Sequence, residues 1–191
     1  MRSLAKAAEL VSSFKQVAVD QTSVNRRFFR LSDTVNEIML TLSPMIRKTP
    51  HTVSCQIPPD LTMESYPGPL GQIITNLINN SFLHGFETGM RGTVTVSAEA
   101  IDNEWLQLSI EDNGAGIPQE NLDRIFDPFF TTKLGQGGSG LGLSIVHNLV
   151  TGVLGGSIKV TSSSGGGTRI SLTLPRTAPA GNQGQGTRLP A

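Results

Sequence analysis

The sequence predicts an α+β fold, an α/β two-layer sandwich preceded by a long bundle helix. Apolar residues recur at helical spacing in some segments and alternate every second residue in others. The alternating segments come in pairs joined by short turns, which favours antiparallel hairpins over repeated βαβ units. We expect a partial helical bundle segment (1–30), a connector helix (31–48), a globular domain (49–175) and a disordered tail (176–191).

The first 48 residues are predicted to form two helices. The first covers residues 3–27, contains no Gly or Pro, and has an apolar stripe about three heptads long. Its apolar positions include Leu4, Ala7, Val11, Phe14 and Ala18. The second covers 31–48 and should face inward through Val35, Ile38, Met39 and Leu42. The first stripe suits pairing with another helix or chain at least as well as packing on the globular domain.

The globular part is predicted to begin with a strand at 51–57, which the Pro58-Pro59-Asp60 turn ends. A helix rich in Ile, Leu and Asn should follow at 69–86, and a second helix at 141–151. Strands are expected at 93–100, 105–112, 157–162 and 168–174. Residues 176–191 are rich in Gly, Pro, Gln and Thr and have little to bury, so we expect them to be disordered.

Composition excludes several function classes. Lys plus Arg and Asp plus Glu both total 15, so the net charge of zero gives no reason to expect bulk attraction to nucleic acid or membrane. A single cysteine, Cys55, leaves no intrachain disulfide and fits a reducing compartment. No apolar run approaches the roughly 18 residues of a membrane span. We expect a cytoplasmic protein, or the cytosolic portion of a membrane-bound one.

Two glycine-rich segments indicate a phosphate-binding loop. One runs from Gly138 to Val146 and leads into a predicted helix, and the other is Asp112-Asn113-Gly114-Ala115-Gly116. Glycines let backbone N–H groups approach a phosphate closely. Gly135, Gly137 and Gly140 match a bare G-x-G-x-x-G, but no strand precedes them, and no Walker A ending is present. A merely flexible loop is the alternative for either segment alone.

Three polar residues follow one face of the helix predicted at 69–86. Asn76 and Asn80 are four residues apart, and His84 continues the line. The amide oxygens would suit Mg²⁺, which prefers oxygen ligands and retains water and phosphate oxygens. A plain polar helix surface is the alternative interpretation of the two asparagines.

Asp112 is predicted to be a buried carboxylate. Alternation places it on the same face as Leu106, Leu108 and Ile110, where an unpaired charge is costly. The adenine amine would supply a donor, whereas guanine places a carbonyl at that position. An internal salt bridge is the alternative, and the glycines that follow favour a ligand.

Together these segments resemble the motifs of sensor histidine kinases. The N box corresponds to Gln72–Ser81, the G1 box to Asp112–Pro118, the F box to Ile125–Lys133 and the G2 box to Gly138–Val146. A closing Gly165-Gly166-Gly167-Thr168 follows, and all five occur in the family's order. The resemblance implies a Bergerat (GHKL) fold that binds ATP and Mg²⁺ between the Asn-rich helix and the glycine loops.

The resemblance also implies roles for individual residues. Asn80 would bind Mg²⁺, Asn76 would contact phosphate or metal-bound water, and Asp112 would bind the adenine amine. Residues from Phe126 to Gly140 would form a mobile lid, from which Lys133 could reach the γ-phosphate. We expect Asn76, Asn80 and Lys133 to be the catalytic residues. The remaining implied cofactor-binding residues are His84, Gly114, Gly116, Ile117, Phe126, Thr131, Thr132, Gly138, Ser139, Gly140, Leu141, Gly142, Leu143 and Thr168.

Two departures from the family pattern narrow the prediction. Leu83 occupies a position that is often basic in the family, so this chain lacks a basic phosphate contact there, and we expect His84 or Lys133 to compensate. No His–acid–x–Arg phosphoacceptor box is present, and His51, His84 and His147 do not fit that role. We therefore expect either a fragment of a longer kinase or a catalytic half that acts in trans. The expected partners are a phosphoacceptor helix, a second copy through the helical bundle, and a response regulator.

Other functions of the same fold remain as alternatives. Hydrolytic relatives place a Glu one turn before the metal-binding Asn to activate water, and here that position is Asn76. This favours phosphoryl transfer to a histidine outside the chain. A nucleotide-binding regulatory module without transferase activity is one alternative. A protein-serine kinase of the anti-sigma-factor type is another, against which the helix at 3–27 argues.

Overall fold

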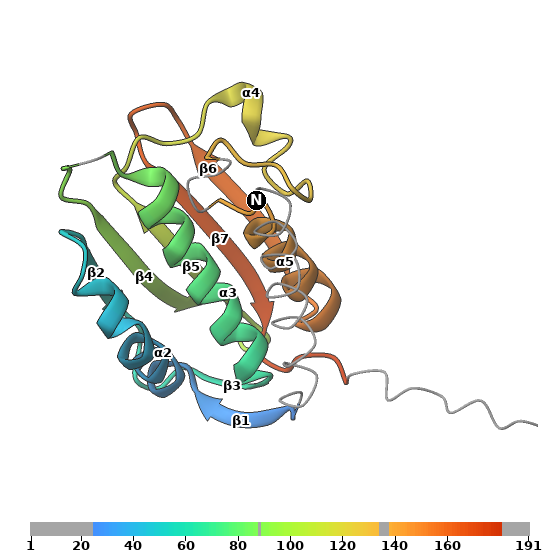
Figure 1. Cartoon of the computed structure of the whole chain (residues 1–191). Coiled ribbons are helices and arrows are strands. Elements are labelled where there is room, and N and C mark those ends of the chain that lie inside the picture. Colours follow the sequence, from blue (N-terminus) through green and yellow to red (C-terminus); the bar gives the residue numbers. More distant parts are fainter. Residues whose placement is uncertain (1–24, 88, 134–137, 181–191) are drawn as a thin grey trace, which may run out of the picture.

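The computed structural model describes residues 25–87, 89–133 and 138–180. A five-stranded sheet is covered on one face by helices (Figure 1). The strand order is β2 (Thr52–Gln56), β4 (Thr93–Ala100), β5 (Trp105–Asp112), β7 (Thr168–Pro175) and β6 (Ser157–Ser162). Only β2 and β4 run parallel within this sheet. The covering helices are α2 (Leu31–Ile46), α3 (Pro67–Asn80) and α5 (Gly142–Asn148). The α+β two-layer fold is confirmed.

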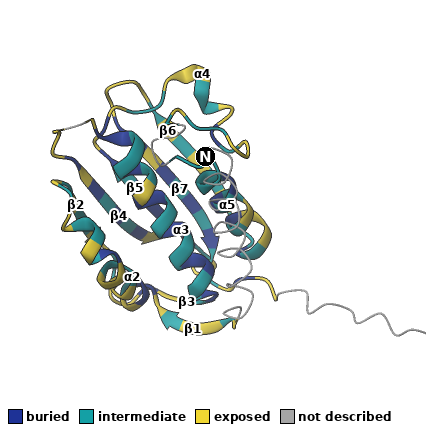
Figure 2. Cartoon of the chain, in the orientation of Figure 1, coloured by how far each residue is buried: buried dark blue, intermediate teal, exposed yellow. Residues whose placement is uncertain are grey.

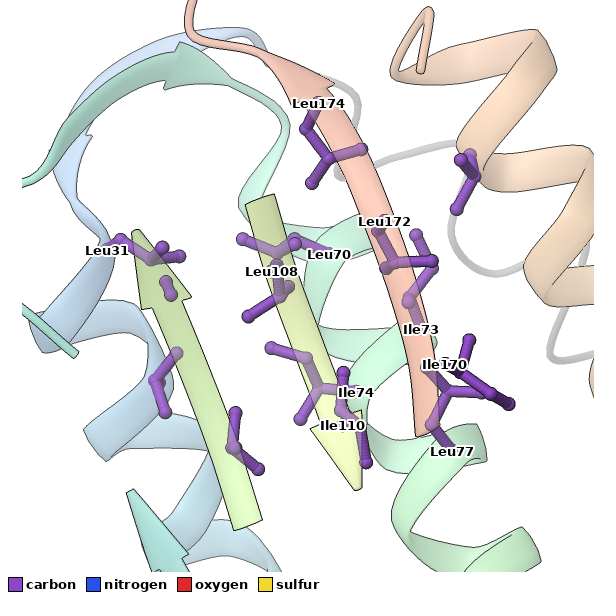
Figure 3. Close-up of a cluster of buried hydrophobic side chains, with 14 of the residues drawn as sticks. Leu31, Leu70, Ile73, Ile74, Leu77, Leu108, Ile110, Ile170, Leu172 and Leu174 are labelled. Carbon is purple, nitrogen blue, oxygen red and sulfur yellow. The ribbon is translucent and has the colours of Figure 1, made fainter. Parts of the chain in front are cut away.

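The core lies between α3 and the central strands. In β5, Leu106, Leu108 and Ile110 point toward the helices and are at most 3% exposed. The antiparallel register places Leu108 opposite both Ala98 and Leu172. Apolar residues of α3 pack on this face (Figure 3), and buried positions alternate along the strands (Figure 2). The period-two pattern in the sequence thus defines the inner face of the sheet.

Both major helices end in a π-turn. Helix α3 begins at Pro67, whose fixed φ suits the first helical position, and continues beyond Asn80 as η2 (Ser81–Gly85). Helix α5 continues as η3 (Leu149–Val153) in the same way. Such wide turns occur often at functional sites, because they turn side chains that a regular helix would present elsewhere.

A second, two-stranded sheet was not predicted. Strand β1 (Arg27–Arg30) pairs antiparallel with β3 (Thr62–Ser65). The helix expected over 3–27 is therefore wrong at Arg27, which begins β1, while residues 1–24 lie outside the described residues. Phe29 packs against the core from this strand, and aromatic residues suit a half-buried pleated surface. The connector helix predicted at 31–48 is present as α2.

The first residues of the predicted tail are packed rather than disordered. Ala178 is 1% exposed, and the Arg176 guanidinium donates to the Thr62 carbonyl. The Tyr66 hydroxyl donates to the Pro179 carbonyl at 2.8 Å. The expectation of a structureless segment from residue 176 is wrong for 176–180, because main-chain groups of β3 pair with it. Residues 181–191 lie outside the described residues.

This C-terminal segment also meets the chain at its entry into the domain. The Arg26 guanidinium donates to the Ala178 carbonyl at 2.6 Å and to Glu64 Oε1 at 2.8 Å. Glu64 lies in β3, between β1 and Thr177. The entry and the exit of the domain are therefore joined at one strand.

Candidate functional site

A cavity of about 310 Å³ lies among the residues that the sequence motifs select. Its walls come from α3 and η2, from the ends of β5 and β7, and from residues 116–125, 130–132 and 138–143. Predicted residues that line it are Asn76, Asn80, His84, Asp112, Gly116, Ile117, Thr131, Thr132, Gly138, Ser139, Gly140, Gly142, Leu143 and Thr168. Predicted residues that do not line it are Gly114, Phe126, Lys133 and Leu141.

Asp112 is a buried carboxylate held by three donors. It is 6% exposed, and the Ser81 hydroxyl donates to its Oδ2 at 2.9 Å. The backbone N–H groups of Gly114 and Thr168 donate to its Oδ1 at 3.0 and 3.3 Å. Burial raises the pKa of Asp112, and these hydrogen bonds act in the opposite direction. Asp112 forms no ion pair with the described residues, so the salt-bridge alternative is not realised there.

The turn after Asp112 is packed too closely for side chains. A Cβ on Gly114 would overlap the Gly85 carbonyl oxygen, and that oxygen accepts a hydrogen bond from the Ala115 N–H at 2.7 Å. Gly116 has φ +73°, in the left-handed region that favours glycine. Gly114 therefore does not line the cavity but donates its N–H to Asp112, whereas Gly116 lines the cavity.

Asn76 and Asn80 present amide groups that have no partner among the described residues. The Nδ2 atoms of both are buried, and no group in that part of the chain forms a hydrogen bond with them. A buried unpaired amide is costly, so a ligand at this position is the simplest explanation. Turning an amide by 180° exchanges its nitrogen and oxygen, so either atom can face the cavity. A Cβ on Gly142 would lie 3.3 Å from Asn80 Oδ1, which places the glycine loop directly against this asparagine.

The glycine loop is attached to the segment that precedes it. The Phe129 N–H donates to the Gly140 carbonyl at 2.8 Å, and both residues have positive φ. The Leu141 N–H donates to the Ser139 hydroxyl at 3.3 Å, so Leu141 shapes the loop although it does not line the cavity. The loop is therefore fixed to Phe129 immediately before α5 begins at Gly142.

His84 and Lys133 line different cavities. His84 Nδ1 lies 3.3 Å from the Thr132 hydroxyl at the cavity wall. Burial and the charge of Lys133 lower the pKa of His84, which favours the neutral imidazole. Lys133 lies in a neighbouring hollow together with Phe82 and Phe86. The structure thus places Lys133 near His84 but outside the main cavity.

Phe126 also lies outside the cavity. Its ring packs against the His147 ring of α5, with centroids 5.4 Å apart. The neighbouring Ile125 and Phe130 line the cavity instead. Within the F box, Ile125 and Phe130 therefore line the cavity in place of Phe126, beside the predicted Thr131 and Thr132.

The sequence reasoning missed several other lining residues. Ser81 is buried and bonded to Asp112, and its position directly after Asn80 was the available signal. Asn121 belongs to the short helix α4 (Gln119–Leu122), which is too short to produce a periodic pattern. The further missed residues are Leu77, Asn79, Leu83, Gly85, Ile110, Pro118 and Ile170.

The chain belongs to the family of histidine kinase-, DNA gyrase B- and HSP90-like ATPases, which it matches over residues 66–178. It is 28% identical over 178 residues to the sensor histidine kinase RcsC of Escherichia coli, covering 90% of this chain but 18% of RcsC. It is 38% identical over 113 residues to the E. coli sensor histidine kinase ZraS, covering 59% of this chain and 23% of ZraS. The chain therefore spans about a fifth of the length of these relatives.

Solved structures show the same fold. The catalytic domain of histidine kinase ThkA is 27% identical with a TM-score of 0.69, covering 80% of this chain and 97% of that domain. A complex of ThkA with the response regulator TrrA matches at 24% identity and a TM-score of 0.69, covering 90% of this chain and 49% of that chain. The chain is thus homologous to the ATP-binding catalytic domain of sensor histidine kinases. No helix in the described part of the chain has the length and hydropathy of a membrane span.

Proposed function

We propose that this chain transfers the γ-phosphate of ATP to a histidine outside it, for relay to an aspartate of a response regulator. One observation carries the proposal: two amides without a partner among the described residues, on Asn76 and Asn80, line the cavity that also contains Asp112, and the glycine loop lies against Asn80. The pair provides neutral oxygen ligands on the phosphate side, and Asp112 provides an acceptor for the base.

The residues present fit a bound Mg²⁺. We propose Asn80 as its ligand and Asn76 as a contact to phosphate or to metal-bound water, because hard cations take amide oxygens. Mg²⁺ held there would neutralise charge on the phosphate oxygens. Gly140 and Gly142 line the cavity, and we propose that the phosphates bind beside them and that Lys133 acts through its charge from the neighbouring hollow.

The cavity favours transfer over hydrolysis. Asp112 is the one carboxylate among the described residues that line it, and its oxygens already accept three hydrogen bonds. Asn76 occupies the position from which a carboxylate would activate water, and an amide cannot accept the proton. A neutral histidine needs no such base, so positioning and charge neutralisation suffice. We infer that the partners are a phosphoacceptor helix, a second copy bound through the helical bundle, and a response regulator.

The experiment supplies the acceptor separately. The chain is incubated with γ-labelled ATP, Mg²⁺ and a helical domain that bears a phosphoacceptor histidine, and acid-labile label on that domain is measured. We expect transfer by the wild type, none by Asn80→Ala, and normal transfer by Gln72→Ala. Gln72 lies on the same helix but does not line the cavity, so it is a matched control.

Two results would contradict the proposal. Release of free phosphate at the same rate with and without the acceptor would indicate an ATPase. Binding of ATP without transfer to any of several acceptor domains would indicate a regulatory module.

A further inference from the structure

The hydroxyl of Ser162, at the end of β6, has three hydrogen-bonding neighbours. It accepts from the Ile117 N–H at 2.8 Å and donates to the Gly167 carbonyl at 2.7 Å. Its third neighbour is the Thr168 hydroxyl at 3.0 Å. Ser162 does not line the cavity, but Ile117 and Thr168 do.

These contacts fix the direction of the hydrogen bond between the two hydroxyls. A hydroxyl has one proton, and Ser162 gives its proton to the Gly167 carbonyl, which can only accept. The Thr168 hydroxyl must therefore donate to Ser162. Thr168 Oγ1 makes no other hydrogen bond with the described residues. Its lone pairs remain available, so Thr168 can only accept from a ligand.

Asp112, like Thr168, offers hydrogen-bond acceptors to a ligand, and the two residues are neighbours. The two residues are directly opposite in the β5–β7 register, where Cβ atoms lie about 4.5–5.5 Å apart. Ser81 and two backbone N–H groups donate to the Asp112 carboxylate, as expected of an ionised acceptor. The wall therefore offers two adjacent acceptors and no competing side-chain donor from either residue.

An exocyclic amino group matches this wall, because it has two hydrogens to donate. A 6-oxo purine places lone pairs at the same position and would face acceptors on both sides. We propose that Ser162 is a positioning residue for nucleobase selection: it takes the Thr168 proton, so that Thr168 and Asp112 together accept both hydrogens of a 6-amino purine. The proposal rests on the proposed binding of ATP at this site.

The test compares ATP with inosine triphosphate, which carries a 6-oxo group in place of the 6-amino group and an N1–H in place of the N1 lone pair. Dissociation constants are measured for the full chain and for Ser162→Ala, Thr168→Val and the double variant. We expect the preference for ATP to fall about tenfold in Ser162→Ala, as one hydrogen bond is lost. Thr168→Val should show the same loss, and the double variant no further loss, because Ser162 acts through Thr168. Ser164→Ala, in the same hairpin and exposed, should retain the preference.

A general structural role for Ser162 would give a different result. If Ser162→Ala weakened the binding of both nucleotides equally, the inference would be overturned. A loss of folded protein affects both dissociation constants alike, so it leaves their ratio unchanged. A further drop in the ratio when Ser162→Ala is added to Thr168→Val would also overturn it. Failure of the wild type to bind either nucleotide would contradict the proposed function itself, and this inference with it.

Discussion

Replacing Asp112 by Asn tests the nucleobase end of the site most directly. The carboxylate is 6% exposed and accepts from Ser81, Gly114 and Thr168. The amide introduced by Asp112→Asn could keep its oxygen toward the two backbone N–H groups, which leaves its NH₂ toward Ser81 and the base. The Ser81 hydroxyl can rotate to accept from that NH₂ group, whereas the adenine amine cannot.

The expected magnitude follows from the loss of one hydrogen bond to a charged group. Such a bond contributes about 1.5–3 kcal/mol, so ATP binding should weaken about 10- to 150-fold. GTP should lose less, because the new NH₂ can donate to the guanine carbonyl. The preference for ATP over GTP should therefore disappear. The near-identical shape of the two side chains should preserve the fold.

Calorimetric titration with Mg-ATP and Mg-GTP measures both constants on the wild type and on Asp112→Asn. Asp127→Asn, which changes an exposed aspartate, is the matched control and should retain the preference. Equal affinity of the wild type for the two nucleotides would refute the assignment of Asp112. A preference that survives in Asp112→Asn would refute it as well.

Four further predictions concern the same domain. Burial raises the pKa of Asp112, so ATP binding by the wild type should weaken as the pH falls through that raised pKa, whereas binding by Asp112→Asn should not change in that window. Without nucleotide, ionising the buried Asp112 should destabilise the fold. The unfolding free energy of the wild type, measured in urea and compared with that of Asp112→Asn, should therefore fall as the pH rises from the ordinary Asp pKa through the raised one. Gly114→Ala should lower stability by about 1–3 kcal/mol through overlap with the Gly85 carbonyl, while Gly152→Ala, which has open space, should not; thermal unfolding compares them. Ile74→Ala should cost about 2–5 kcal/mol in urea unfolding, because Ile74 is fully buried under the sheet.

The strands of the main sheet were predictable from sequence because apolar residues occur at every second position along them. Strands β4, β5 and β6 have the predicted bounds, since each alternates and is bounded by turn residues. Strands β1 and β3 were missed: each has four residues, and their pairing joins positions far apart in the chain. Short segments carry too little periodicity to reveal such pairing. The packed residues 176–180 were missed for the same reason, because their partner is β3.

Site residues were predictable where they lie on a regular helix or strand, because sequence spacing then indicates which face they share. Helical spacing correctly placed Asn76, Asn80 and His84 on one cavity wall, and strand alternation correctly placed Asp112 on the inner face. Ser81 was not predicted because its hydrogen bond to Asp112 joins residues 31 positions apart, and the spacing within the Asn-rich helix does not reveal such a contact. The positions of Lys133 and Phe126 depend on how irregular segments pack, which periodicity does not describe.

The hydrogen bond from Arg26 to the Ala178 carbonyl holds the two ends of the domain together. The residues at which the domain begins and ends are neighbours in space. Segments attached to the two ends would therefore start close to each other. Such a unit can be exchanged as a cassette without changing the separation of the segments on either side. A circular permutant that links 26 to 178 and opens the chain at an exposed loop should therefore retain the fold and its cavity.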